Sequence, residues 1–206
     1  MDKNEITKIL KDLKIVSPTT GNNLSEPYEF NLMFGTQIGP TGKLKGYLRP
    51  ETAQGIFVNF KKLLEENGGK VPFAAAQIGN SYRNEISPKS GLLRVREFAQ
   101  AEIEHFCDKN KGVIYPKYEN ITDEKVAFWK REDQENNVEP QFLSVKNAFE
   151  KKMITNQTLA FYIYKTLKFL LNIGINGKFL RFRQHLKNEM AHYASDCWDA
   201  EIRTSY

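Results

Sequence analysis

The chain has 206 residues, of which 40% are hydrophobic, and it carries a formal net charge of +5. It therefore contains enough apolar material for a sizeable core, in one domain or in one domain with an insertion. We find no signal peptide and no apolar run long enough to cross a membrane, so no membrane partner is expected. The charge is compatible with nucleic acid but is too small to argue for it alone.

Three elements are expected before residue 70. The spacing of Ile6, Ile9, Leu10 and Leu13 predicts a short amphipathic helix within residues 1–16. A strand is expected over 29–38. A helix with an apolar stripe is expected over about 52–67, where two glycines stop it.

The segment 73–106 alternates with a period of two and predicts two antiparallel strands, 73–85 and 92–106. A loop of turn-forming residues with one lysine joins them, and we expect this loop to be mobile. One face of the second strand is apolar and is expected to pack against the core: Leu93, Val95, Ala99, Ala101 and Ile103. The other face is polar and carries one aromatic ring: Arg94, Arg96, Phe98, Gln100, Glu102 and Glu104.

The polar face has two interpretations, a solvated surface or a binding site. Arginine suits phosphates, an aromatic ring suits a base, and carboxylates suit an ammonium group. Arg94, Phe98 and Glu102 are spaced by four residues and would lie roughly 13 Å apart in turn along one strand face. That span fits a nucleotide laid along the strand with an amino acid at its far end.

The second half of the chain begins with a charged segment and continues with helix and strand patterns. Residues 108–139 are charged and are expected to form an insertion, with a short helix around Glu124 to Arg131. We expect helices over 144–153 and 158–172, a strand over 179–185, a helical turn over 189–194 and a strand over 197–206. Asp199, Glu201 and Arg203 could line a site or a solvated face. The histidines and the two cysteines show no metal-ligand spacing, so no metal site is expected.

Several segments of the sequence resemble those of a known family. The pattern Tyr82-Arg83-x-Glu85, a loop, then Arg94-x-x-x-Phe98-x-x-x-Glu102 resembles motif 2 of the class II aminoacyl-tRNA synthetases. Further words are similar to glycyl-tRNA synthetases of the eukaryotic and archaeal type: 46–55, 77–87, 181–185, 189–193 and 197–201. The resemblance runs from about Ser17 to Tyr206 and is weakest between Cys107 and Asn156.

The resemblance implies an α+β fold with a class II synthetase-like antiparallel sheet flanked by helices, incomplete and with a helical or irregular insertion. It divides the chain into a catalytic core with motif 2 (1–106), an insertion and helical region (107–177), and a return to the catalytic core truncated before motif 3 (178–206).

The resemblance also implies a reaction, in which ATP with Mg²⁺ activates glycine to glycyl-adenylate and the glycyl group then passes to tRNA(Gly). Arg83 is the expected catalytic residue, on the α-phosphate. The other ATP-binding residues are expected to be Asn84, Glu85, Arg94, Val95 and Phe98, and the loop from Ile86 to Leu92 would face the tRNA acceptor end. Glu51 and Glu102 would bind glycine. Without the resemblance, the better interpretation of Glu51 is a favourable carboxylate at a helix start, and the resemblance reverses that preference.

Parts of the family pattern are absent: motif 3, an anticodon-binding domain and a clear motif 1. We therefore expect a catalytic-domain fragment that is not competent alone, from an enzyme that is cytoplasmic or mitochondrial and homodimeric at full length. The alternative is a synthetase-derived module that binds nucleotide, RNA or protein without catalysis.

Overall fold

The computed structural model describes residues 2–88, 91, 93–108 and 115–205. It divides the chain into two compact units, unit 1 (Met1–Phe106) and unit 2 (Cys107–Tyr206), which are described separately. Both combine helices with antiparallel strand pairs, which confirms the α+β class. Within the described ranges, no helix is both long enough and apolar enough to span a membrane. The division at 177, with the roles assigned to each part, stays a prediction.

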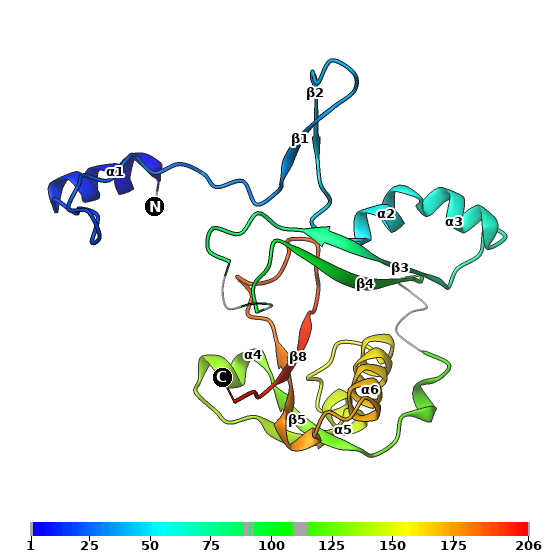
Figure 1. Ribbon diagram of the computed structural model, residues 1–206. Coiled ribbons are helices and arrows are strands. Elements are labelled where there is room, and N and C mark those ends of the chain that lie inside the picture. Colours follow the sequence, from blue (N-terminus) through cyan, green and yellow to red (C-terminus); the bar gives the residue numbers. More distant parts are fainter. Residues whose placement is uncertain (1, 89–90, 92, 109–114, 206) are drawn as a thin grey trace. The chain divides into compact units, whose positions relative to one another are not determined.

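Unit 1 contains a lone helix, two hairpins and a helix pair (Figure 1). Its elements are α1 (Lys3–Asp12), β1 (Gly35–Ile38), β2 (Leu44–Tyr47), α2 (Ala53–Val58), α3 (Phe60–Glu66), β3 (Phe73–Tyr82) and β4 (Glu97–Phe106). The amphipathic N-terminal helix and the long hairpin are confirmed, the hairpin with shorter strands than expected. The strand expected over 29–38 is wrong for its first half, because the carbonyls of Asn31 and Leu32 accept from Asn84 instead of a neighbouring strand.

The helix expected over 52–67 is divided in two at Asn59. The Asn59 amide donates to the carbonyl of Gly55 at 2.8 Å, a local bond that competes with regular helix geometry. The expected stop is confirmed at Gly68 and Gly69, whose φ angles of 67° and 69° favour residues without a side chain.

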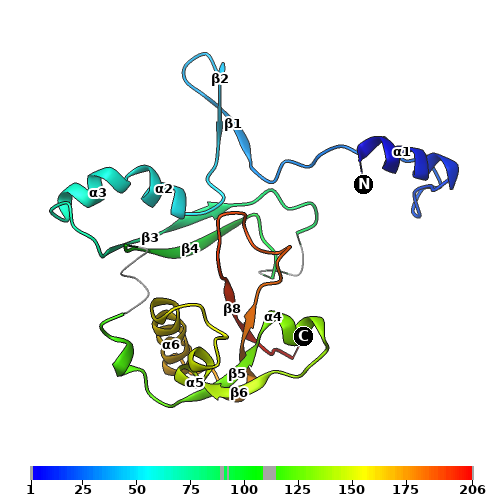
Figure 2. The same ribbon diagram turned by 180° about the vertical axis from the view of Figure 1, so that it is seen from behind.

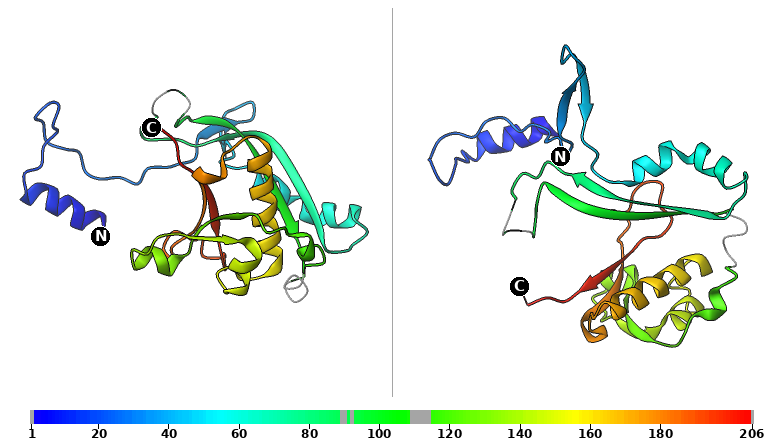
Figure 3. Two further views of the ribbon diagram at one scale, coloured as in Figure 1. Left: turned by 90° about the horizontal axis from the view of Figure 1, so that it is seen from below. Right: turned by 45° about the vertical axis from the view of Figure 1, so that its right-hand side comes forward.

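The hairpin β3–β4 pairs residue for residue from Phe73↔Phe106 to Tyr82↔Glu97 (Figure 3, right). The period of two is confirmed, but the face expected to pack is wrong. Ile78 and Ile103 on the apolar face are 81% and 70% exposed, whereas α2 covers part of the polar face. Helix α2 binds that face through polar contacts described below, together with an aromatic cluster where the strands meet α3. The rings of this cluster belong to Phe57, Phe60, Phe73 and Phe106.

Unit 2 is a mixed four-stranded sheet with two helices on one face (Figure 2). Its elements are η1 (Tyr118–Asn120), β5 (Lys125–Trp129), α4 (Arg131–Glu135), β6 (Gln141–Ser144), α5 (Val145–Glu150), α6 (Gln157–Asn172), η2 (Gly177–Phe179), β7 (Leu180–Gln184) and β8 (Trp198–Ile202). The strand order is β6-β5-β7-β8, in which only the β5–β7 pair is parallel.

The helix expected over 158–172 is confirmed and begins one residue earlier. The helix expected over 144–153 and the strands expected over 179–185 and 197–206 are confirmed at shorter bounds. The short helix expected around Glu124 to Arg131 is wrong, because this segment is strand β5. Its alternate residues Val126 and Phe128 are fully buried, and a strand can bury alternate side chains on one face. The helical turn expected at 189–194 is also wrong, since only isolated turns occur there.

The core of unit 2 lies between this sheet and helices α5 and α6. Phe128 and Phe182 face each other on paired strands with ring centroids 5.7 Å apart, and Leu167 of α6 and Val145 of α5 pack in the same cluster. The opposite face of the sheet is more polar, and there the Arg181 guanidinium lies over the Trp129 ring.

Burial of Phe128 in this core leads to a prediction about the stability of unit 2. Phe128→Ala should lower the free energy of unfolding of unit 2 by about 3–5 kcal/mol, because it removes a fully buried ring and leaves a cavity. Phe142→Ala on the paired strand is the matched control, since Phe142 is 62% exposed. Both tryptophans lie in unit 2, so fluorescence-monitored urea unfolding reports on this unit. Equal effects of the two substitutions would contradict this account of the core.

Candidate functional site

The polar face of the β3–β4 hairpin brings together three of the residues singled out in the sequence, Arg83, Phe98 and Glu102. Arg83 directly follows β3, and its backbone N–H donates to the carbonyl of Arg96 at 3.0 Å, which continues the hairpin pairing. The Arg83 guanidinium lies over the ring of Phe98 on β4, 5.3 Å from its centroid. Its Nε also donates to the carbonyl of Pro50 at 3.4 Å, which ties the segment before Glu51 to the hairpin.

Glu102 connects β4 to the start of α2. Its Oε2 accepts from the hydroxyl of Thr52 at 2.5 Å and from the backbone N–H of Ala53 at 2.6 Å. A side chain on a strand thus caps a helix that is remote in sequence. The same carboxylate that is expected to bind glycine therefore has a structural role as well.

A second layer of polar contacts supports Thr52. Gln77, which pairs with Glu102 across the hairpin, donates from its amide to the carbonyl of Thr52 at 3.0 Å. The Gln77 amide oxygen accepts from Nη1 of Arg49 at 2.8 Å, and Nε of Arg49 donates to the carbonyl of Asn80 at 2.9 Å. These bonds fasten the segment before α2 to β3.

Two glycines allow this close approach. A Cβ on Gly55 would lie 2.4 Å from the Gln77 amide, and a Cβ on Gly79 would lie 2.2 Å from the Arg49 guanidinium. Both positions need a residue without a side chain unless the polar groups move.

Carboxylates gather at the end of this face. Burial raises the pKa of Glu104 above its usual value, and the charges of Glu102 and Glu51 raise it further. Glu51 accepts a 2.8 Å bond from Gln54 in the first turn of α2. The arrangement favours a cationic ligand, because a positive charge would relieve the repulsion among the three carboxylates.

The remaining predicted nucleotide residues lie near the start of β4. Arg94 and Glu85 form an ion pair at 3.8 Å and line a hollow of about 660 Å³ with Leu32. Because β4 begins at Glu97, the regular spacing that joins Phe98 to Glu102 does not extend to Arg94.

Asn84 and Val95, which are also predicted to contact the nucleotide, lie outside the polar face of the hairpin. Asn84 bonds the carbonyls of Asn31 and Leu32 at 3.0 and 2.8 Å, and Val95 is half-buried. In the expected tRNA-facing loop, residues 89, 90 and 92 lie outside the described residues.

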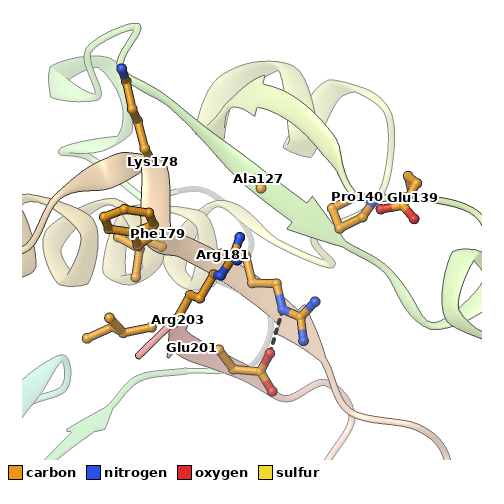
Figure 4. Close-up of a pocket in the computed structure, with 10 residues that line it drawn as sticks. Ala127, Glu139, Pro140, Lys178, Phe179, Arg181, Glu201 and Arg203 are labelled. Carbon is orange, nitrogen blue, oxygen red and sulfur yellow. Dashed lines mark hydrogen bonds and ion pairs between the residues drawn. The ribbon is translucent and has the colours of Figure 1, made fainter. Parts of the chain in front are cut away.

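Unit 2 carries a separate charged face. Glu201 on β8 binds Arg181 at 2.6 Å and Arg183 at 3.0 Å, and Asp199 binds His185 at 2.8 Å. Figure 4 shows the Arg181–Glu201 pair inside a hollow of about 840 Å³, with Arg203 also in its wall. Asp199 and Glu201 on β8 therefore pair with the arginines of β7, whereas Arg203 lies just beyond β8.

Sequence reasoning missed Thr52, Gln77 and Arg49 as parts of the site. The sequence did contain indications of these residues. Arg49 and Thr52 lie close to Glu51 in the segment 46–55, which resembles the family, and Gln77 lies on the polar strand face. Their contacts with one another depend on the hairpin register and on where α2 lies, which no local pattern contains.

The family model described as tRNA synthetase class II core domain (G, H, P, S and T) matches residues 41–193. A glycine–tRNA ligase of Drosophila melanogaster is 58% identical over 208 residues, covering 100% of this chain and 27% of that protein. The mitochondrial glycine–tRNA ligase 1 of Saccharomyces cerevisiae is 54% identical over 203 residues, covering 98% of this chain and 29% of that protein.

A glycine–tRNA ligase of Methanothrix thermoacetophila is 48% identical over 203 residues, covering 98% of this chain and 35% of that protein. The chain thus spans about a third or less of the length of these relatives. The matched model covers the polar hairpin face and much of unit 2, and the chain belongs to the class II tRNA synthetase core-domain family.

Proposed function

We propose that, within the intact protein, this chain supplies the glycine- and ATP-binding face of a glycine–tRNA ligase. The observation that carries the proposal is the series of groups on one hairpin face: the Arg83 guanidinium, the Phe98 ring and the carboxylate of Glu102. The names of relatives that are 48–58% identical to the chain support glycine as the amino acid and tRNA(Gly) as the acceptor.

In the proposed reaction, the glycine carboxylate attacks the α-phosphate of ATP, which gives glycyl-adenylate and pyrophosphate. Such a step depends on in-line positioning and charge stabilisation more than on an acid–base pair. Arg83 would stabilise the negative charge that shifts onto the α-phosphate oxygens. The Arg83 guanidinium lies 5.3 Å from the centroid of the Phe98 ring, so neighbouring groups would bind the phosphate and the adenine.

Glu85, Asn84 and Val95 would contact the nucleotide, and Arg94, whose side chain is 63% exposed, would reach the outer phosphates. Mg²⁺ would arrive with the triphosphate. Among the described residues, no group of three or more His, Cys, Asp or Glu side chains could hold a metal ion without it. The ion would add charge stabilisation at the phosphates.

Glycine has no side chain to grip, so its ammonium must supply much of the affinity. Glu102 and Glu51 would accept from it, and both already repel Glu104. Each such contact is worth about 1.5–3 kcal/mol, the range for hydrogen bonds to charged groups. The activated glycyl group would pass to the terminal ribose of tRNA(Gly), near the loop from Ile86 to Leu92. We further propose that the intact protein is a homodimer and that it acts in the cytoplasm or in mitochondria.

The direct test is glycine-dependent ATP–pyrophosphate exchange and tRNA(Gly) charging by the intact protein, with alanine and serine as competing amino acids. Exchange with glycine alone would support the ligase. Binding of ATP or RNA without exchange would favour the alternative, a binding module without catalysis.

Removing the Arg83 guanidinium should lower exchange. In the intact protein, Arg83→Ala should reduce glycine-dependent exchange by roughly a hundredfold or more, the scale for loss of a transition-state charge stabiliser. Arg83→Lys should recover little, because a point charge cannot reproduce the two-pronged geometry of a guanidinium. Lys61→Ala on the exposed side of α3 is the control and should leave exchange unchanged. Near-normal exchange by Arg83→Ala would remove this residue from the mechanism.

Neutralising Glu102 should separate glycine binding from ATP binding. Glu102→Gln retains a carbonyl oxygen for Thr52 and Ala53 but loses the negative charge, so glycine KM should rise about tenfold or more with ATP KM nearly unchanged. Glu102→Ala opens space and should also admit alanine. Steady-state exchange kinetics measure these effects, with Glu65→Gln on α3 as the control. Normal glycine KM together with a raised ATP KM would place the glycine pocket elsewhere.

A further inference from the structure

We propose that Thr52 is a positioning residue for Glu102. Its hydroxyl holds one carboxylate oxygen and leaves the other available for the ligand cation. This inference rests on the proposed function, since it concerns how the glycine-binding carboxylate is oriented.

The first observation is that the Thr52 hydroxyl bonds to Glu102 and not to the backbone of its own helix. Thr52 stands at the N-cap position of α2, where a threonine with an extended backbone usually accepts from its own helix, but its φ of −85° and ψ of −15° are helical. Here its side chain makes no capping bond, and Oγ1 instead donates to Oε2 of Glu102 at 2.5 Å. The capping role passes to Glu102, which accepts from the N–H of Ala53.

The second observation is that the two oxygens of Glu102 differ. Oε2 accepts two hydrogen bonds, whereas Oε1 accepts none from the described part of the chain. A carboxylate held at one oxygen by two donors from a rigid segment has few rotamers left. Oε1 is therefore held in one orientation and remains open to an ammonium group, which the negative charges of Glu102, Glu51 and Glu104 would attract.

The third observation is that Thr52 is itself firmly held. It is fully buried, and its carbonyl accepts from Gln77, which Arg49 in turn supports. Such backing is what a positioning residue needs, because a loosely held donor could not orient a carboxylate. The buried hydroxyl also needs an acceptor for its own hydrogen, and Glu102 supplies it.

The substitution that isolates this role is Thr52→Val, which keeps the shape of the side chain and removes the hydroxyl. In exchange assays of the intact protein, Thr52→Val should raise glycine KM about tenfold, with ATP KM and kcat changed less than about twofold. Thr52→Ser keeps the donor and should return glycine KM to within about threefold of wild type.

A double variant tests whether Thr52 acts through Glu102. If it does, Thr52→Val combined with Glu102→Gln should show no higher glycine KM than Glu102→Gln alone, because coupled residues are not additive. A multiplied effect would overturn the inference. So would a normal glycine KM in Thr52→Val, or equal increases in the KM for glycine and for ATP, which would indicate a merely structural role.

Crystal structures give a readout that does not require activity. In Thr52→Val the Glu102 carboxylate should leave its wild-type orientation, whereas in Thr52→Ser it should keep it. An unmoved carboxylate in Thr52→Val would overturn the inference. A wild-type protein that lacks glycine-dependent exchange would instead overturn the proposed function, so the two failures are distinguishable.

Discussion

The arrangement of unit 1 depends on the bond between the carboxylate of Glu102 and the start of α2. Without it, the Thr52 hydroxyl and the Ala53 N–H would both lack an acceptor near a fully buried residue. Leaving such donors unsatisfied costs about 1–3 kcal/mol each. Together with the bonds of Gln77 and Arg49, this charged side chain sets the position of the helix, and with it the position of Glu51, relative to the strand that carries Phe98.

This constraint explains why the hairpin packs on its polar side. Helix α2 contributes few large apolar side chains to the contact, and Gln77 and Arg49 complete it through directed hydrogen bonds. Hydrogen bonds fix distance and angle, whereas apolar contacts tolerate sliding. A face built in this way suits a ligand that must be held in one geometry, and it leaves Ile78 and Ile103 exposed on the other side of the strands.

Unit 2 follows the opposite plan. Its sheet buries an apolar face formed by Phe128, Phe182 and their neighbours under α5 and α6, and its open face is tied together by ion pairs between β7 and β8. Partly exposed pairs of this kind contribute little stability individually. Burial of the aromatic core is therefore expected to be the larger contribution to the stability of this unit, and the ion pairs connect β7 to β8 on its open face.

Local spacing and composition are enough to identify the family, the hairpin, the helix stops at Gly68 and Gly69, and the residue types of the polar face. That the polar face is the covered one and that 125–129 is a strand depends on contacts between segments distant in sequence. Alternation shows that two faces differ, but not which one meets a neighbour. The pairing of Glu102 with Gln77 and Thr52 likewise arises from strand register and helix placement, since these residues lie far apart along the chain.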